Sequence, residues 1–175
     1  MSVTETAAIP EQIDASSGEK PQKTIDVQDL KLRLQGPAGI VEILKGVDLS
    51  VKAGERVSLV GPSGSGKTSL LMVIAGLEQA QEGVVNVCGK DLRSLDEDGL
   101  ALYRRHHVGI VFQDFHLIPT MSALENVALP MEFAGRKDAF EKAQEELELV
   151  GLGHRIGHYP GQLSGGEQQR VALAR

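Results

Sequence analysis

A glycine-rich stretch at residues 61–68, GPSGSGKT, has the residue types and spacing needed to hold a phosphate group. It fits the pattern G-x-x-x-x-G-K-[ST], in which glycines let backbone N–H groups curl around phosphate oxygens where a Cβ would collide. The helix expected after it adds its positive N-terminal end to the same anion. In this pattern Lys67 places a full charge on the β- and γ-phosphates, and the Thr68 hydroxyl can ligate Mg²⁺.

The loop and the first helical residues are the candidate nucleotide-binding residues: Gly61, Pro62, Ser63, Gly64, Ser65, Gly66, Lys67, Thr68 and Ser69. A chance match to the pattern occurs in roughly 1 of 100 to 200 chains of this length. An apolar strand pattern before the loop and a helical pattern after it favour the functional interpretation. A hydrolase nucleophile elbow is excluded, because neither Ser63 nor Ser65 is flanked by glycine at both −2 and +2.

A second informative string is LSGGEQQR at residues 163–170. Ser-Gly-Gly before a helical pattern predicts a helix N-terminus with exposed N–H donors and a hydroxyl, which is a second place for an anion. Alone the string is weak evidence for anion binding, because Ser-Gly at a helix start is usually only a cap. Together with the phosphate loop upstream it is strong evidence for a second anion-binding segment.

The surrounding elements alternate between strands and helices before the chain becomes helical throughout. Apolar residues at every second position predict strands at 24–34, 47–51 and 84–87. Short β-branched runs predict strands buried on both faces at 56–60 and 108–112. Helical patterns follow at 69–77, at 96–105 with Asp96 as N-cap, around 124–131, and at 140–150. Residues 1–22 have no hydrophobic period and are predicted to be a mobile tail.

Composition narrows the class of protein. The 175 residues are 41% hydrophobic and 24% charged, with a net charge of −6, which argues against a nucleic-acid partner. The longest apolar stretches are well below the roughly 20 residues needed to span a bilayer. The N-terminus lacks the pattern of a secretory signal, and the one cysteine, Cys88, cannot form an internal disulfide. We therefore expect a soluble cytoplasmic domain, with Cys88 buried as a small hydrophobic residue and the five histidines on the surface.

The motifs resemble those of the ATP-binding subunits of ABC transporters. GPSGSGKT is similar to their Walker A motif, and LSGGE to their signature motif, with Glu167 where many members have Gln. Gln113, which follows VGIVF, occupies the position of the Q-loop glutamine. The amino-acid sequences around Gln113 and in the signature segment most resemble those of the group that serves lipoprotein release and macrolide export, with YbbA-type ATPases nearest. The resemblance covers residues 24–175.

The resemblance implies an α/β fold: a P-loop nucleotide-binding domain at 23–175 with an N-terminal antiparallel β layer and an inserted helical subdomain at about 114–165. Two such domains close head to tail around two ATP molecules. Carried over by position, 63–68 would hold the phosphates of one ATP. Gln113 would sense Mg²⁺ and the attacking water, so Lys67 and Gln113 are the catalytic candidates, and Thr68 and Gln113 the metal candidates. The signature residues would face the ATP of the opposite subunit: Leu163, Ser164, Gly165, Gly166 and Glu167.

The resemblance also implies partners and a location. It predicts an ATP-dependent homodimer, bound through an integral membrane permease subunit to the inner face of the cell membrane. The loop at 114–121 would face a cytoplasmic helix of that permease, and its apolar residues suit such a contact. Core packing of the helical block explains them about as well. These residues are Phe115, Leu117, Ile118 and Met121.

The sequence departs from the family pattern in two places. Leu34 stands where the family usually has an adenine-stacking aromatic residue. The family pattern continues after Arg175 with a strand ending in Asp-Glu (Walker B), a D-loop and a switch histidine, so we expect a C-terminally incomplete domain without ATPase activity of its own. Two alternatives remain open: a non-transport ABC ATPase of cell division or DNA repair, and a module that binds ATP without hydrolysing it.

Overall fold

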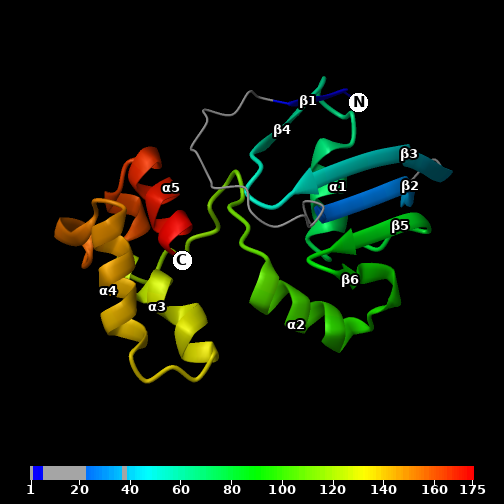
Figure 1. Ribbon diagram of the computed structural model, residues 1–175. Helices are drawn as coiled ribbons and strands as arrows, with labels where there is room; N and C mark the ends of the chain where they lie inside the picture. Colours follow the sequence, from blue (N-terminus) through cyan, green and yellow to red (C-terminus); the bar gives the residue numbers. More distant parts are fainter. Residues whose placement is uncertain (1, 6–22, 37–38) are drawn as a thin grey trace, which may run out of the picture. The chain divides into compact units, whose positions relative to one another are not determined.

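The computed structural model describes residues 2–5, 23–36 and 39–175, which form two compact units. The first unit ends at Gly109 and contains all the described strands, and the second runs from Ile110 to Arg175 and is helical (Figure 1). Each unit has its own hydrophobic core and is described by itself.

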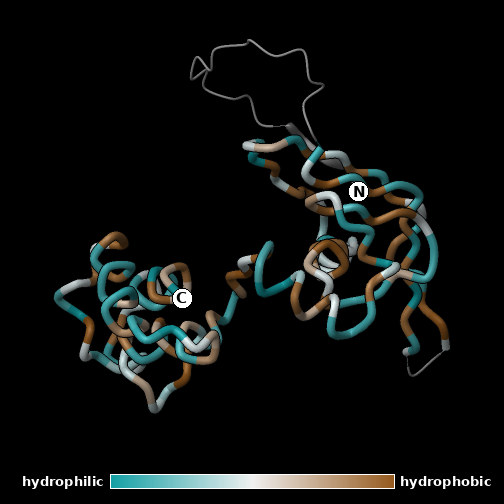
Figure 2. Tube along the Cα trace, turned by 60° about the horizontal axis from the view of Figure 1, so that its bottom comes forward, coloured by the Kyte–Doolittle hydropathy of each residue, from teal (hydrophilic) through white to brown (hydrophobic). Residues whose placement is uncertain are grey.

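The first unit is organised around an antiparallel sheet with strand order β3-β2-β5-β6. Its strands are β2 (Lys23–Gly36), β3 (Gly39–Lys52), β5 (Glu82–Val87) and β6 (Lys90–Asp91). Buried and exposed residues are interspersed along them, and Figure 2 shows hydrophobic and hydrophilic residues mixed along the chain. The predicted strands at 24–34, 47–51 and 84–87 are therefore confirmed, and so is the antiparallel β layer.

A bulge in β2 sets the local register of the sheet. The pairing of β2 with β3 shifts between Val27 and Leu30, and Asp29 takes a left-handed φ of 43°. The Asp29 N–H, freed from regular pairing, donates to Asp48 Oδ1 at 2.9 Å. β5 passes so close to this bulge that a Cβ on Gly83 would lie 2.6 Å from the Asp29 carbonyl oxygen. Only glycine fits this position of β5.

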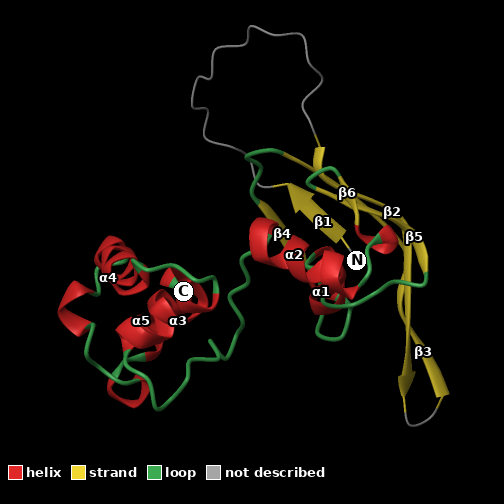
Figure 3. Cartoon of the chain, turned by 90° about the horizontal axis from the view of Figure 1, so that it is seen from below, coloured by secondary structure: helices red, strands yellow, loops and turns green. Residues whose placement is uncertain are grey.

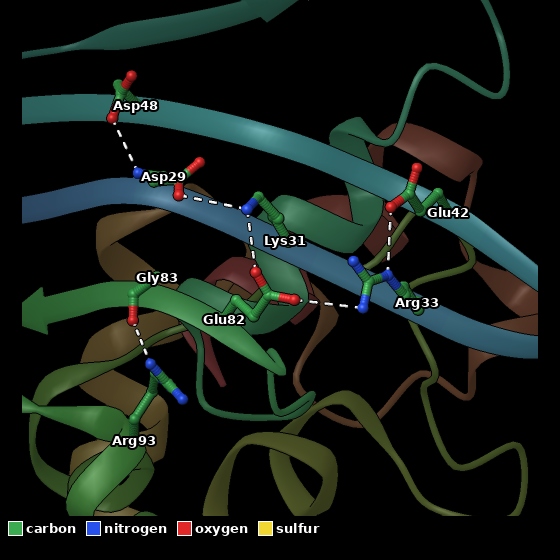
Figure 4. Close-up of polar contacts among 8 residues, drawn as sticks. All are labelled: Asp29, Lys31, Arg33, Glu42, Asp48, Glu82, Gly83 and Arg93. Atoms are coloured by element: carbon green, nitrogen blue, oxygen red, sulfur yellow. Dashed lines mark hydrogen bonds and ion pairs between the residues drawn. The ribbon is translucent and has the colours of Figure 1, made fainter.

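Ion pairs cross the exposed face of the sheet beside this bulge (Figure 4). The Glu82 carboxylate of β5 lies 2.9 Å from Lys31 Nζ and 3.2 Å from Arg33 Nη1. Arg33 Nε also lies 3.2 Å from Glu42 Oε1 of β3. The hydrogen bond from Lys31 lowers the pKa of the Glu82 carboxyl. Solvent screens such exposed pairs, so they contribute little to stability compared with the apolar core beneath.

Two helices cover one face of the sheet: α1 (Lys67–Ile74) and α2 (Glu97–His107) (Figure 3). α2 begins at the predicted cap, where the Asp96 carboxylate accepts the Gly99 N–H at 2.8 Å. Tyr103 of α2 is buried and donates its hydroxyl to the Ile74 carbonyl oxygen at 2.7 Å, and burial raises its pKa to about 12. The largest fully buried side chains of this core are Val27, Leu30, Leu32, Leu44, Leu70, Val85 and Tyr103.

Strand β4 (Val57–Val60) differs from the prediction in its surroundings. It pairs with β1 (Ser2–Glu5) in a separate two-stranded antiparallel sheet, and Val57 and Val60 are 37% and 50% exposed. The prediction of a strand was correct, but that of burial on both faces was wrong, because only Leu59 packs against the core. Ser2–Glu5 is likewise a strand where a tail was expected, and the rest of that tail lies outside the described residues.

Two further predictions are wrong. Residues 108–112 form no strand, and Ile110 and Val111 are 36% and 45% exposed. An apolar β-branched run becomes a strand only beside a hydrogen-bonding neighbour, and no described strand pairs with this one. Cys88 is exposed, with φ of 49°, because it belongs to the turn between β5 and β6 rather than to a strand.

The second unit packs three helices around a core of small and branched side chains. They are α3 (Ala123–Phe133), α4 (Ala139–Leu149) and α5 (Gly165–Ala174), with short 3-10 turns η2 (Gly153–Arg155) and η3 (Pro160–Gln162) before α5. Both helices predicted after residue 122 are present. Phe140, the first residue of the predicted helical pattern at 140–150, is 45% exposed, and Ala139 before it is buried. None of the helices in the described part of the chain has the length and apolar character required to cross a membrane.

Candidate nucleotide-binding site

The glycine-rich loop joins β4 to α1, as predicted. Gly66 is the N-cap of α1 with φ of 89°, and no side chain of the described residues caps this helix end. A Cβ on Gly66 would lie 2.9 Å from Leu44 Cδ2 and 3.1 Å from the Ile43 carbonyl oxygen. Glycine is therefore required here both by the left-handed backbone and by the close approach of β3. The first turn of α1 contains no acidic residue, so its positive end is not offset locally.

Lys67 brings a cation to the same loop. Its Nζ donates to the carbonyl oxygens of Gly61 at 2.9 Å and Pro62 at 2.7 Å, and lies 3.4 Å from Ser65 Oγ. The Ser65 N–H donates to the Pro62 oxygen at 3.3 Å, which tightens the turn. Neutral carbonyl oxygens therefore hold the ammonium group, and no carboxylate is paired with it among the described residues. A phosphate oxygen is a stronger acceptor than a carbonyl and can replace these contacts.

The rest of the predicted loop set lies on the same loop and first turn. Pro62, Ser63 and Gly64 are exposed, Ser69 is half-buried and Thr68 is exposed. The Thr68 hydroxyl is therefore accessible to a metal ion bound by a phosphate. Leu34, the position expected near the base, is 38% exposed on β2.

Gln113 belongs to the second unit and is exposed in a turn. The backbone after it is strained, because Phe115 and His116 both take left-handed φ values, 57° and 48°. Arg175 of the C-terminal helix end donates to both carbonyl oxygens, at 2.9 Å for Phe115 and 2.8 Å for His116. Sequence reasoning missed Arg175, because its partners lie far away in the chain.

Asn126 orders the rest of the loop and was also missed. This fully buried side chain accepts the Ile118 N–H at 2.7 Å and donates to the carbonyl oxygens of Ile118, Met121 and Ser122 at 3.0–3.1 Å. A polar residue on the apolar face of a predicted helix was the available signal. Leu117 packs against the helical core, so core packing accounts for this one of the apolar loop residues.

The signature segment forms the N-terminus of α5. Ser164 is the N-cap: its hydroxyl accepts the Glu167 N–H at 3.3 Å, and its own N–H and hydroxyl both lie 2.8 Å from Glu167 Oε2. Arg155 Nε lies 3.1 Å from the other carboxylate oxygen. These hydrogen bonds, led by the Ser164 N–H, lower the pKa of Glu167 to about 2. Leu163 is buried in the helical core, whereas Gly165 and Gly166 are exposed.

The predicted site residues thus fall into two groups. Residues 61–69 are brought together in the first unit, and Gln113 lies in the second unit with the signature residues 163–167. Within the second unit, both ends of α5 have a defined role, with Ser164 at its start and Arg175 at its end.

Residues 44–175 match the family model described as ABC transporter, and the chain belongs to the ABC transporter family, as an ATP-binding domain. It is 49% identical to the uncharacterized ABC transporter ATP-binding protein YbbA of Escherichia coli K12 over 156 residues, which are 88% of this chain and 68% of that protein. It is 52% identical over 140 residues to the lipoprotein-releasing system ATP-binding protein LolD 2 of Caulobacter vibrioides, covering 79% and 61% of the two chains. The resemblance to the lipoprotein-release and YbbA group is therefore confirmed.

Solved structures agree with this assignment. The chain is similar to a dimeric post-hydrolysis state of the ATP-binding cassette MJ0796 bound to ADP and Pi, with a TM-score of 0.78 and 40% identity. The match covers 86% of this chain and 67% of that one. The predicted fold class, an α/β P-loop domain with an antiparallel β layer and a helical part, is thereby confirmed.

Proposed function

We propose that residues 61–69 bind Mg-ATP and that the full-length protein hydrolyses it as the energising subunit of a membrane transporter. The observation that carries this proposal is the phosphate loop, in which an uncapped helix N-terminus and the Lys67 ammonium converge on one turn. Both features attract an anion with several negative charges. The neighbour bound to ADP and Pi and the ATP-binding relatives support the choice of nucleotide.

Each residue has a proposed role. Lys67 neutralises the β- and γ-phosphates, and the Thr68 hydroxyl ligates Mg²⁺ on the first turn of α1. Gln113 senses the metal ion and orients the attacking water, which makes it the second catalytic residue. Metal-assisted charge neutralisation and water positioning supply most of the catalysis in phosphoryl transfer.

Two copies act together in this proposal. Ser164, Gly165 and Gly166 of one subunit contact the γ-phosphate held by the other, so ATP drives the formation of a homodimer. The dimeric state of the solved neighbours supports this arrangement. The exposed glycines leave room for a phosphate beside the N-terminus of α5.

We further propose that a permease docks on the loop at 114–121 and holds the subunit at the inner face of the membrane. Its strained backbone and half-buried apolar residues support this role. We also place the catalytic carboxylate outside residues 1–175, so that these residues alone bind ATP without turnover. The chain spans 68% of the YbbA relative, which leaves room for it in a longer protein.

The proposal is tested by an ATP titration of Lys67→Ala in the full-length protein. We expect the affinity for ATP to fall about 100-fold or more, since the positive charge beside the phosphates is lost. Lys90→Ala is the matched control, because Lys90 also follows a glycine but is exposed on β6. An unchanged dissociation constant for Lys67→Ala would remove the phosphate-loop assignment.

A further inference from the structure

The signature segment already contains an anion. Glu167 Oε2 lies 2.8 Å from both the Ser164 N–H nitrogen and the Ser164 hydroxyl oxygen, and the carboxylate is only 16% exposed. A serine hydroxyl has one proton to donate, and a carboxylate is acceptor-only. The Ser164 proton is therefore committed to Glu167 in this structure. A phosphate oxygen that accepts a hydrogen bond from the Ser164 hydroxyl must therefore replace the Glu167 carboxylate as the acceptor.

The same Ser-Glu geometry also occurs at the start of α3, where it caps the helix. At the start of α3, Ser122 N and Oγ lie 2.7 and 2.8 Å from Glu125 Oε2, and the Glu125 N–H donates back to Ser122 at 3.2 Å. There, Ala123 is buried and Leu124 is half-buried, so the side chains of the first turn face the protein core. At α5 the corresponding first-turn residues are the exposed glycines Gly165 and Gly166.

The two capping boxes also differ in the partner of the carboxylate. Glu167 has Arg155 Nε at 3.1 Å on its second oxygen, and Arg155 Nη1 lies 3.1 Å from His158 Nε2. Among the described residues, Glu125 has no ion-pair partner within the same range. A helix cap needs no such cation. The arginine lets the Glu167 carboxylate remain charged and in place after it has lost its bond to Ser164.

We propose that Glu167 is a positioning residue that competes with the incoming nucleotide phosphate for Ser164, and that Arg155 retains the carboxylate once Ser164 has been released. The proposal rests on the proposed function, in which Ser164 binds the γ-phosphate of the opposite subunit. Its consequence is a threshold for dimerisation. The ligand must displace the Glu167 carboxylate against like-charge repulsion, and only a ligand with enough negative charge releases the Ser164 hydroxyl in this way.

The test measures dimerisation of the full-length protein in the presence of Mg²⁺ and the non-hydrolysable analogue AMP-PNP. We expect Glu167→Gln to lower the dimer dissociation constant about tenfold, because the neutral amide keeps the shape but neither repels the phosphate nor holds the hydroxyl as strongly. The same variant should unfold at a lower urea concentration than the wild type. A gain in dimer affinity combined with a loss of stability is a result that a purely structural cap cannot produce.

Glu125→Gln is the matched control, because it makes the same chemical change in the same capping geometry. We expect it to lower the stability, because it weakens the same cap, and to leave the dimer dissociation constant unchanged. Arg155→Gln should weaken the dimer several-fold, since it leaves the displaced carboxylate without a cation beside the phosphate.

The outcomes separate the proposal from the function on which it rests. If the wild type dimerises with AMP-PNP and Glu167→Gln dimerises equally or more weakly, Glu167 is only a cap and the proposal is wrong. If Arg155→Gln leaves the dimer unchanged, the role of Arg155 is wrong. If the wild type binds AMP-PNP without dimerising, the proposed contact of Ser164 across the dimer fails, and the competition fails with it.

Discussion

The N-termini of α1 and α5 are both proposed to bind phosphate, but they are built in opposite ways. α1 begins at Gly66 with no side-chain cap, and the ammonium of Lys67 is folded into the turn before it. α5 begins with a complete capping box, and the carboxylate of Glu167 occupies the position next to its N-terminal N–H groups. One end thus concentrates positive charge, and the other already contains a negative charge.

This difference indicates when each end can bind a ligand. A helix N-terminus has an effective charge of about +0.5, which favours an anion in either case. At α1 no side chain in the described part of the chain caps the helix end, so we expect a nucleotide to bind to a single chain. At α5 Ser164 and Glu167 already satisfy the helix end with a carboxylate. In the proposed function, an external phosphate therefore binds there only when a second subunit presents it. The two ends therefore suit two successive steps, binding and dimerisation.

The largest effect that would sharpen this comparison is expected from Ser164→Arg. The long side chain would fill the space above Gly165 and Gly166, so nucleotide-driven dimerisation should be lost. The affinity of the single subunit for ATP should stay within about twofold of the wild type, because α1 is untouched. Sedimentation and an ATP titration measure the two quantities.

Ser122→Arg controls for the lost cap, which is worth about 1 kcal/mol of stability, and it should still dimerise. If Ser164→Arg instead lost ATP binding in the single subunit, Ser164 and Lys67 would belong to one site. The distinction between the two helix ends would then be wrong.

A smaller effect is expected from alanine substitutions of the glycines at the two ends. Gly66→Ala places a Cβ at φ of 89° within 2.9 Å of Leu44, and we expect ATP affinity to fall about tenfold with a loss of about 1–3 kcal/mol of stability. The Cβ that Gly165→Ala adds meets no atom of the described residues within 4 Å, so this variant should leave both the stability and the ATP affinity of the single subunit unchanged. Urea unfolding and ATP titration test both variants, and equal losses would contradict the comparison.

The smallest effect concerns pH. Hydrogen bonds from Ser164 lower the pKa of Glu167 from 4.5 to about 2, so this carboxylate stabilises the fold fully above about pH 4.5, and that contribution is lost as the pH falls toward 2. The difference in urea midpoint between wild type and Glu167→Gln should therefore be constant at neutral pH and shrink in this acidic range. The difference between wild type and Lys67→Ala should show no such change, and a parallel decline would contradict the contrast between the two ends.

Periodicity predicted the elements that bury one face and expose the other. β2, β3 and α2 have one buried and one exposed face, and each alternates in its sequence accordingly. The predictions for the two runs expected to be strands buried on both faces, 56–60 and 108–112, were less accurate. β4 is a strand with exposed valines, and residues 108–112 are not a strand. Such runs depend entirely on neighbouring strands, and a sequence pattern contains no information on which neighbour is present.

By itself, the sequence determined the phosphate loop and the caps of α2 and α5, because these depend on residues within a few positions of one another. Asp96 accepts a hydrogen bond from three residues ahead, and so does Ser164. Only the tertiary structure decided that Arg155 meets Glu167, 12 positions away, and that Arg175 meets the carbonyls of Phe115 and His116, 60 and 59 positions away. Long side chains reach partners that the packing of helices places beside them, and that packing results from the whole core rather than from any local pattern.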